Sequence, residues 1–178
     1  VSSFQNVDGS TLDSTQTLTV LGSSAANAIT GGLGADTIDG GGGVDTISAG
    51  GGADTVAYRG TEASIDGGTG INTLQLKAAA VVDLAASADQ TSGDAVTVVG
   101  FRNIDATALT DGATLTGDVL ANTITGGAGA DTIGGGGGAD VIAAGAGDDA
   151  VKLEGNETSI DGGTGINTLV LELSGAIS

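Results

Sequence analysis

A nine-residue pattern, Gly-Gly-x-Gly-x-Asp-x-(Ile/Val/Leu)-x, recurs in fixed phase through this chain and restricts its fold more than any other feature. Copies begin at Gly31, Gly40, Ala49, Gly67, Gly126, Gly135, Ala144 and Gly162. The eighth position stays aliphatic even where the glycines and the aspartate have changed. It is occupied by Ile29, Ile38, Ile47, Val56, Ile65, Leu74, Ile124, Ile133, Ile142, Val151, Ile160 and Leu169. A short repeat of this kind predicts a stacked coil in which each turn covers its neighbours.

The composition also favours a stacked core over a globular one. Two Phe, one Tyr, no Trp and no Met cannot fill a globular interior of 178 residues. A net charge of −18 with 35 glycines is typical of disorder, but the mean hydropathy of +0.26 and the regular aliphatic positions argue against it. We expect disorder only without metal, because stacked like-charged loops repel one another.

The charge balance limits the partners. With 22 acidic and 4 basic residues, we exclude nucleic acid and anionic membranes as electrostatic partners, and cations become the natural ones. We expect neither a membrane-spanning segment nor a signal peptide, because no long apolar run and no basic-then-apolar leader occurs. The chain has no Cys and no His, so disulfides, thiolate sites and the usual zinc ligand are absent.

The chain is a tandem duplication. Residues 22–76 and 117–171 are identical at 37 of 55 positions, at an offset of 95. Outside the glycine-rich blocks, Phe4-Gln5-Asn6-Val7-Asp8 matches Phe101-Arg102-Asn103-Ile104-Asp105. We therefore predict a first unit over 1–76, with a strand lead-in at 1–21 and a repeat block at 22–76. A connection over 77–116 and a second block over 117–178 follow, and we expect the whole to be cut from a longer array.

Each nonapeptide predicts one glycine turn and one three-residue strand with a single inward side chain. Two nonapeptides complete one flattened coil of eighteen residues, so equivalent loops stack at every second repeat. Residues 80–84 and 95–99 of the connection read as strands. We expect the connection to continue the solenoid with longer coils; the alternative is a small separate β-domain.

The pattern resembles the calcium-binding nonapeptide of the repeats-in-toxin (RTX, hemolysin-type) family of secreted bacterial proteins, which includes cytolysins, metalloproteases, lipases, adhesins and surface-layer proteins. The clearest matches are Gly31–Asp39 and Gly126–Gly134. The resemblance implies an all-β, right-handed parallel β-roll with Ca²⁺ between stacked loops. Calcium prefers six to eight hard oxygen ligands in flexible geometry, and glycine turns expose carbonyl oxygens beside the carboxylate.

Carried over residue by residue, the resemblance implies that side chains two repeats apart share each ion, with about three ions per block. The implied pairs are Asn27 with Asp45, Asp36 with Asp54, Asp54 with Asn72, Asn122 with Asp140, Asp131 with Asp149, and Asp149 with Asn167. The implied carbonyl ligands are Gly31, Leu33, Gly50, Gly52, Gly68, Gly70, Gly126, Ala128, Gly145, Gly147, Gly163 and Gly165.

Two repeats depart from the pattern. Ala63 and Thr158 stand at the sixth position, so we expect the sites that would follow Asp45 and Asp140 to be absent or weak. Glu62 and Glu157 lie one residue earlier, either as substitute ligands or as solvated caps, and we favour the solvated caps. Asn at the block edges is expected to weaken those sites.

We expect no catalysis, because no nucleophile, base and orienting group can be assembled. The leading hypothesis is a structural module of an extracellular or cell-surface protein (an adhesin, surface layer or filament) that folds on meeting calcium and self-associates through open ends. The alternative is the calcium-responsive module of a type I secreted toxin or enzyme, from a Gram-negative bacterium. A lesser alternative is an ice- or glycan-binding surface formed by Thr37, Thr46, Thr55 and Thr132.

Overall fold

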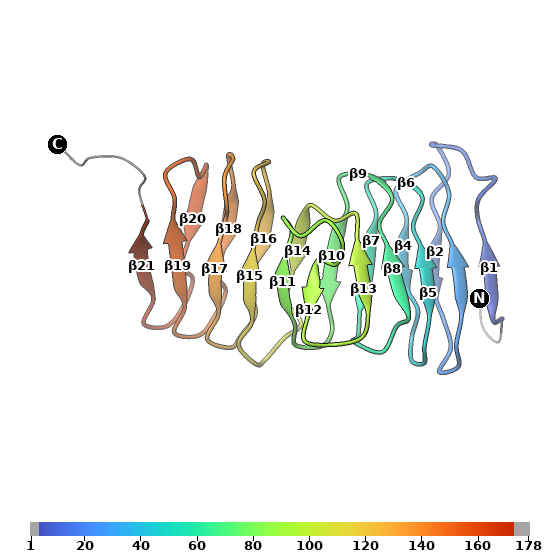
Figure 1. The fold of residues 1–178 in the computed structure, drawn as a ribbon, viewed down its shortest axis with the longest axis horizontal. Helices are drawn as coiled ribbons and strands as arrows, with labels where there is room; N and C mark the ends of the chain where they lie inside the picture. The colour runs from blue at the N-terminus through green and yellow to red at the C-terminus, as the bar shows by residue number, and fades with distance from the viewer. Residues whose placement is uncertain (1–3, 173–178) are drawn as a thin grey trace.

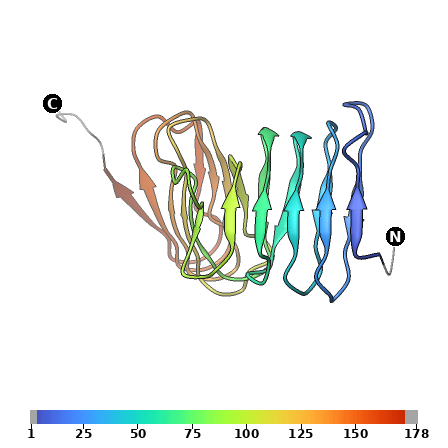
Figure 2. The ribbon, with the colours of Figure 1, turned by 45° about the vertical axis from the view of Figure 1, so that its right-hand side comes forward.

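The computed structural model describes residues 4–172, which form one elongated β-solenoid (Figures 1 and 2). The described residues contain strands and turns but no helix, and hence no helix able to cross a membrane. The predicted all-β parallel solenoid is confirmed. The outermost residues of the predicted units, 1–3 and 173–178, lie outside the described part.

One face of the solenoid is a single parallel sheet of eight strands that runs almost its whole length (Figure 1). In spatial order these strands are β2 (Thr19–Leu21), β4 (Thr37–Asp39), β7 (Thr55–Tyr58), β10 (Thr73–Leu76), β14 (Asn103–Asp105), β16 (Thr123–Thr125), β18 (Val141–Ala143) and β20 (Ser159–Asp161).

The opposite face is divided between two sheets. The first consists of β1 (Asn6–Asp8), β3 (Ala28–Thr30), β5 (Thr46–Ser48), β8 (Ser64–Asp66) and β13 (Thr97–Val99). The second consists of β12 (Thr91–Ser92), β11 (Val81–Asp83), β15 (Thr114–Thr116), β17 (Thr132–Gly134), β19 (Ala150–Leu153) and β21 (Thr168–Leu171). Only β11 and β12 pair antiparallel in these sheets. Two further short strands, β6 (Gly51–Gly52) and β9 (Thr69–Gly70), pair in parallel within the loops of one edge.

The coil length within each block is eighteen residues. Ile29, Ile47 and Ile65 lie opposite one another in β3, β5 and β8. Each strand turns its middle, eighth-position side chain inward, and most of these residues are at most 2% exposed. The aliphatic row predicted from the repeat is therefore the core of the solenoid.

Residues 77–116 carry wider coils between the blocks. The two strands expected at 80–84 and 95–99 are present as β11 and β13. Pairing partners are here 33 residues apart, as for Ser64 and Thr97. The larger interior is filled by Tyr58 and Phe101, the bulkiest fully buried side chains. Buried Gln90 donates hydrogen bonds to the carbonyls of Leu84 and Phe101 and accepts one from the Phe101 N–H, so its polar atoms are satisfied.

The connection moves the second block by half a coil relative to the first. Strand β3 belongs to the five-stranded sheet, but its equivalent 95 residues later, β16, belongs to the eight-stranded sheet on the other face. The same exchange holds for β4 and β17 in the opposite sense. Every repeat loop of one block therefore lies on the opposite edge of the solenoid from its equivalent in the other.

The threonine rank considered as an ice- or glycan-binding surface does not form as predicted. Thr37 and Thr55 lie in the eight-stranded sheet, whereas Thr46 lies in the five-stranded sheet and Thr132 in the six-stranded one. These four residues do not form one rank because successive nonapeptides place their strands on alternate faces, so neighbouring copies of the motif cannot share one surface.

Candidate metal centres

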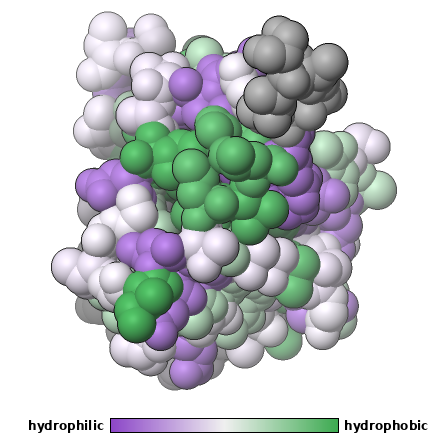
Figure 3. Space-filling view, turned by 90° about the vertical axis from the view of Figure 1, so that its left-hand side faces the viewer, coloured by the Kyte–Doolittle hydropathy of each residue, from purple (hydrophilic) through white to green (hydrophobic). Residues whose placement is uncertain are grey.

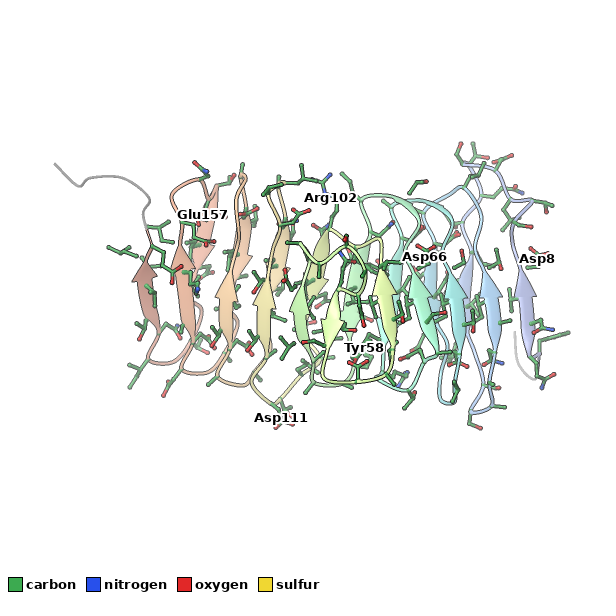
Figure 4. The ribbon with its side chains drawn as sticks, viewed as in Figure 1. Asp8, Tyr58, Asp66, Arg102, Asp111 and Glu157 are labelled. Atoms are coloured by element: carbon green, nitrogen blue, oxygen red, sulfur yellow. The ribbon has the colours of Figure 1, made fainter. Side chains whose placement is uncertain are left out.

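The sixth-position side chains form columns along the two edges of the solenoid. We call these the upper and lower edges, as oriented in Figure 4, where Arg102 and Glu157 mark the upper loops and Asp111 a lower loop. On the upper edge, Asp36, Asp54 and Asn72 of the first block are followed by Asn122 and Asp140 of the second. On the lower edge, the columns are Asn27 with Asp45, then Asp131, Asp149 and Asn167. Each edge thus carries one column of three residues and one of two.

Every column is held by the same hydrogen bond. The backbone N–H of one member donates to the Oδ1 atom of the residue eighteen positions later. This bond joins Asn27 to Asp45 (2.8 Å), Asp36 to Asp54 (2.7 Å), Asp54 to Asn72 (3.0 Å), Asn122 to Asp140 (2.8 Å), Asp131 to Asp149 (2.8 Å) and Asp149 to Asn167 (2.9 Å). The structure therefore brings together all six residue pairs that the sequence suggested.

Two coils missed by sequence reasoning extend the columns. The Leu18 N–H donates to Asp36 Oδ1, and the Ala113 N–H donates to Asp131 Oδ1, both at 2.7 Å. These positions carry no carboxylate or amide, so the motif gave no signal for them. Their irregular loops nevertheless stack on the repeat loops: the Gln16 carbonyl oxygen lies where a side chain on Gly34 would have to go.

The second carboxylate oxygen separates two kinds of aspartate. In Asp36 and Asp131, Oδ2 accepts the N–H of Gly32 or Gly127 of the same loop, at 2.7 and 2.8 Å. In Asp45, Asp54 and Asp149, Oδ2 is buried and has no hydrogen-bond partner. A buried carboxylate oxygen without a partner is strongly unfavourable, and a cation is the partner that fits an ionised group. These three atoms make three of the four columns suitable for metal; the column of Asn122 and Asp140 has no such oxygen.

Burial changes the acidity of three column residues. Loss of solvent raises the pKa of Asp45, Asp54 and Asp140, and the hydrogen bond from the preceding coil only partly offsets it. For Asp54, the nearby charge of Asp36 raises the pKa further. The ionised state of these carboxyls is therefore disfavoured unless positive charge lies close by.

Glycine loops bring backbone carbonyls against the columns. The Gly52 oxygen would be 1.7 Å from a side-chain carbon on Gly70, and the Gly147 oxygen 2.0 Å from one on Gly165. Both Gly70 and Gly165 have φ near +120°, which only glycine adopts readily. The close contact with a carbonyl oxygen and the positive φ both require glycine at these positions. Cβ atoms there would force neighbouring coils apart.

The carbonyls suggested as ligands differ in what they bond. Gly50 accepts a hydrogen bond from the Thr69 N–H, and Gly145 accepts one from the Thr164 N–H. Of the other carbonyls suggested by sequence, Gly52 and Gly147 lie in the same two loops, and the rest lie in the repeat loops one coil before or after them. The carbonyls of Gly32 and Gly127, which sequence reasoning missed, also face the next coil, where they accept hydrogen bonds from Gly51 and Ala146. Among residues 4–172 no three acidic side chains converge, so a cation in these columns would draw most of its ligands from the backbone.

The terminal asparagines close their columns without needing metal. Asn72 Oδ1 accepts the Asp54 N–H, while its Nδ2 donates to the carbonyls of Gly67 and Gly100. Asn167 repeats this arrangement with Asp149 and Gly162. Because an amide both accepts and donates, it satisfies carbonyls that a carboxylate would leave unpaired.

The loops that lack a sixth-position carboxylate are closed by glutamate. Glu62 is buried, and it accepts hydrogen bonds from the N–H groups of Arg59 and Thr61. The favoured prediction of a solvated cap was wrong for Glu62, because its carboxylate folds back onto its own loop. Half-buried Glu157 accepts hydrogen bonds from the N–H groups of Glu154 and Gly155.

The RTX calcium-binding nonapeptide repeat matches residues 21–56 and 116–151, in four copies. The chain carries RTX calcium-binding repeats. The two matched segments contain every column residue except Asn72 and Asn167, the closing asparagines. A comparison with curated proteins found no match.

RTX repeats bind calcium and occur in secreted bacterial proteins, so this chain is a calcium-binding structural module of a bacterial protein. The RTX assignment and the orphaned carboxylate oxygens agree on the kind of ligand. Calcium is a hard cation that accepts a few carboxylates among several carbonyl oxygens, which is the donor set of these edges.

Proposed function

We propose that this chain is a non-catalytic, calcium-rigidified spacer or lattice element of a secreted or cell-surface protein, of the adhesin, surface-layer or filament type. In this proposal the chain stays unfolded at cytosolic calcium levels, leaves a Gram-negative cell by type I secretion, and folds outside. The observation that carries the proposal is the set of buried, unpartnered oxygens on Asp45, Asp54 and Asp149 within stacked glycine loops.

The proposed ion positions follow the six residue pairs, about three per block. Asp54 and Asp149 are each shared by two pairs, so we propose them as the central side-chain ligands. Asn27, Asp36, Asp45, Asn72, Asn122, Asp131, Asp140 and Asn167 complete the proposed side-chain set, with loop carbonyls supplying the remaining oxygens. The sites that use a closing asparagine should fill last, because a neutral amide offers weaker attraction than a carboxylate.

Calcium would supply enough free energy to control folding. Extracellular modules bind calcium with dissociation constants of about 10⁻⁴ to 10⁻³ M. At tenfold excess over such a constant, one site contributes about 1.4 kcal/mol, and six contribute about 8 kcal/mol. A typical domain is stable by about 5 to 15 kcal/mol. At submicromolar calcium this contribution vanishes, while the repulsion of a chain with net charge −18 persists.

A calcium titration followed by circular dichroism tests the proposal. We expect a disordered spectrum in chelator and a strand spectrum in millimolar calcium, with magnesium as the control ion. Magnesium should be less effective because it demands a smaller octahedral site and gives up water reluctantly. An identical strand spectrum in chelator and in calcium would overturn the proposal.

The second candidate is the calcium-responsive secretion module of a type I secreted toxin or enzyme. Its support is the same set of repeats, since they serve either role. The duplication of a whole 95-residue unit favours the spacer, because length and stiffness grow with each added copy. The neighbouring parts of the parent protein would decide: further copies of the unit support the spacer, and a catalytic domain supports the secretion module.

A further inference from the structure

The two blocks place different charges around two equivalent column residues. Asp45 and Asp140 are at most 1% exposed, and the Oδ1 atom of each accepts the N–H of the asparagine eighteen residues earlier, at 2.8 Å. Residues 22–76 contain six acidic side chains and one basic one, whereas residues 117–171 contain eight and one. Figure 3 looks onto the second block and shows hydrophilic patches on both sides of an apolar one. Two of the changes of charge lie directly beside these columns.

The first change concerns the carboxylate that binds a glycine N–H next to each column. In the first block the Gly41 N–H donates to Asp39 Oδ1 at 2.9 Å, and Arg59 donates to both carboxylate oxygens of Asp39. In the second block the equivalent Gly136 N–H donates to Glu154 Oε2 at 2.7 Å. Glu154 is the equivalent of Arg59, and the equivalent of Asp39 is a glycine. A neutral ion pair is thus replaced by a single carboxylate that accepts the same hydrogen bond.

The second change lies at the start of each column loop. Ser23 and Asp118 are equivalent, and the N–H of each donates to the Oδ1 atom of its column asparagine, Asn27 or Asn122, at 2.8 Å. The side-chain oxygen of each also accepts the N–H of the residue two positions later. The turn is therefore the same, but a hydroxyl is replaced by a carboxylate. Together the two changes add two negative charges beside the column of the second block.

These flanking charges act on the column residues. Burial raises the pKa of Asp140, and the charges of the surrounding carboxylates, Asp118 and Glu154 among them, raise it further. Burial also raises the pKa of Asp45, but there the two charges of the neighbouring ion pair act in opposite directions. Since no three acidic side chains converge among residues 4–172, the flanking carboxylates act through their charge rather than as ligands in one cluster.

The burial of a ligand oxygen favours the other column. Asp45 Oδ2 is buried without a hydrogen-bond partner, and Asp140 has no such oxygen. The Arg59 guanidinium, however, already places positive charge near Asp45 and meets part of this demand before any ion binds. Around Asp140 every charge that shifts its pKa is negative, so a cation there also relieves the repulsion between carboxylates. The balance of charge therefore favours ion binding at the second column.

We propose that Asp118 and Glu154 determine the calcium affinity of the Asn122–Asp140 site and make it bind calcium at lower concentrations than its equivalent in the first block. The equivalent Asn27–Asp45 site, flanked by a hydroxyl and a neutral ion pair, binds calcium less tightly. Two additional unit charges near a divalent ion should change the dissociation constant about tenfold at moderate salt. This inference rests on the proposed function, because it takes both residue pairs as calcium sites.

A calcium titration of the full chain followed by hydrogen exchange and mass spectrometry tests the order of binding. The amides of loops 40–45 and 135–140 report on the two sites separately. Protection of loop 135–140 should be half complete at a calcium concentration about tenfold lower than protection of loop 40–45. Equal midpoints, or the reverse order, would overturn the inference.

Two variants of the second block remove the flanking charges. Glu154→Gln keeps an oxygen for the glycine N–H, and Asp118→Ser introduces the residue of the first block. Each should raise the calcium midpoint of loop 135–140 about threefold, and both together about tenfold. Asp111→Asn, an equal loss of charge at an exposed position on the lower edge (Figure 4), is the control and should leave the midpoint unchanged. A Glu154→Gln midpoint equal to that of the control would show a purely structural role and contradict the inference.

Arg59→Gln tests the sign of the effect in the first block. Removal of this cation should lower the calcium midpoint of loop 40–45 about threefold, although it also breaks the ion pair with Asp39. A raised midpoint would count against the inference, because it would mean that the ion pair supports calcium binding rather than opposing it.

Circular dichroism of the same samples separates this inference from the proposed function. If calcium induces a strand spectrum and protects both loops at the same concentration, the proposed function stands and the difference in affinity alone is refuted. If calcium induces neither a strand spectrum nor protection of either loop, the proposed function fails and this inference fails with it.

Discussion

The two repeat blocks have nearly the same sequence but sit in different surroundings. They are identical at 37 of 55 positions, and both wind with eighteen residues per coil. In the first block Ile65 and Leu74 are fully buried, because the wide coils of residues 77–116 cover them. In the second block the equivalent Ile160 is half-buried and Leu169 is largely exposed. Burial in a solenoid is therefore a property of the next coil rather than of the residue.

The blocks also differ in which edge each column occupies. The three-residue column of the first block lies on the upper edge and that of the second block on the lower edge, because the connection changes the phase by half a coil. The predicted binding residues are nevertheless equivalent in hydrogen bonding. The geometry of each loop is therefore determined within its block, whereas the connection over 77–116 determines on which edge of the solenoid the loop lies.

The largest change in unfolding free energy should come from shortening equivalent core side chains in the two blocks. Ile65→Ala removes a fully buried side chain and should cost about 2 to 5 kcal/mol of unfolding free energy. Ile160→Ala, at the half-buried equivalent, should cost less than about 2 kcal/mol, because water already reaches this end. Urea unfolding in millimolar calcium measures both, and equal losses would show that the second block is covered in solution.

The next effect separates the central aspartates from ordinary surface charge. Asp54→Ala and Asp149→Ala each remove a carboxylate that belongs to two proposed sites and carries an orphaned oxygen. Each should lose about two calcium ions and, at tenfold calcium excess, about 3 kcal/mol of stability. Exposed Asp111, which belongs to no pair, provides a control in Asp111→Ala with equal loss of charge. Isothermal titration calorimetry measures the number of ions, and an unchanged number in Asp54→Ala would contradict the assignment.

A smaller effect should appear on acidification. Burial raises the pKa of Asp45 in the first block and of its equivalent Asp140 in the second, so the folded state holds protons more tightly than the unfolded state. The metal-free chain should therefore gain strand signal as the pH falls from 7 towards the ordinary value of 3.8.

With calcium the sign reverses, because protons compete with the ion for the same carboxylates. Circular dichroism across this pH range, with and without calcium, measures both trends. Below 3.8 the gain should end, because the carboxyls of the unfolded chain then bind protons as well. Further acidification should cost stability, since Asp39, whose pKa is lowered mainly by its hydrogen bond from Arg59, then loses its charge. A metal-free chain that only loses strand signal on acidification would contradict the prediction.

The smallest effect concerns an ion pair found in the first block only. Arg59 donates to both carboxylate oxygens of Asp39, at 2.9 and 2.7 Å, and the second block has Glu154 and Gly134 at these positions. Because the Arg59 side chain is 38% exposed, Arg59→Ala should cost at most about 1 kcal/mol. A double-mutant cycle with Asp39→Asn isolates the pair, and a coupling well above that figure would show that the ion pair orders its loop.

The repeat made much of this structure predictable. The period fixes which side chain points inward and which loops stack, so the core row from Ile29 to Leu74 follows from spacing. The six column pairs were implied by the resemblance to RTX repeats. Other features depend on contacts that the motif does not encode. Leu18 and Ala113 join the columns through backbone N–H groups, which every residue type possesses. Glu62 is buried because its own loop offers two N–H groups, a local geometry that residue type does not reveal.

The exchange of faces between equivalent strands of the two blocks was the feature hardest to predict from the sequence. It depends on how many strands the 77–116 segment contributes and on where each begins. The pairing distance lengthens there to 33 residues between β8 and β13 and to 30 between β10 and β14. With no glycine motif to set the phase, the count of half-turns could not be read from composition or periodicity. The threonine rank failed for the related reason that neighbouring strands belong to different faces.

The half-coil displacement has a consequence for any longer assembly of such units. If each further unit added another half coil, the three-residue column would lie on the upper edge in one unit and on the lower edge in the next. The structure would then repeat only after every two units. A receptor or a neighbouring solenoid that binds one edge would then meet equivalent loops only at alternate units. Spacing between attachment points would be set by the linking segment, independently of the ion-binding loops themselves.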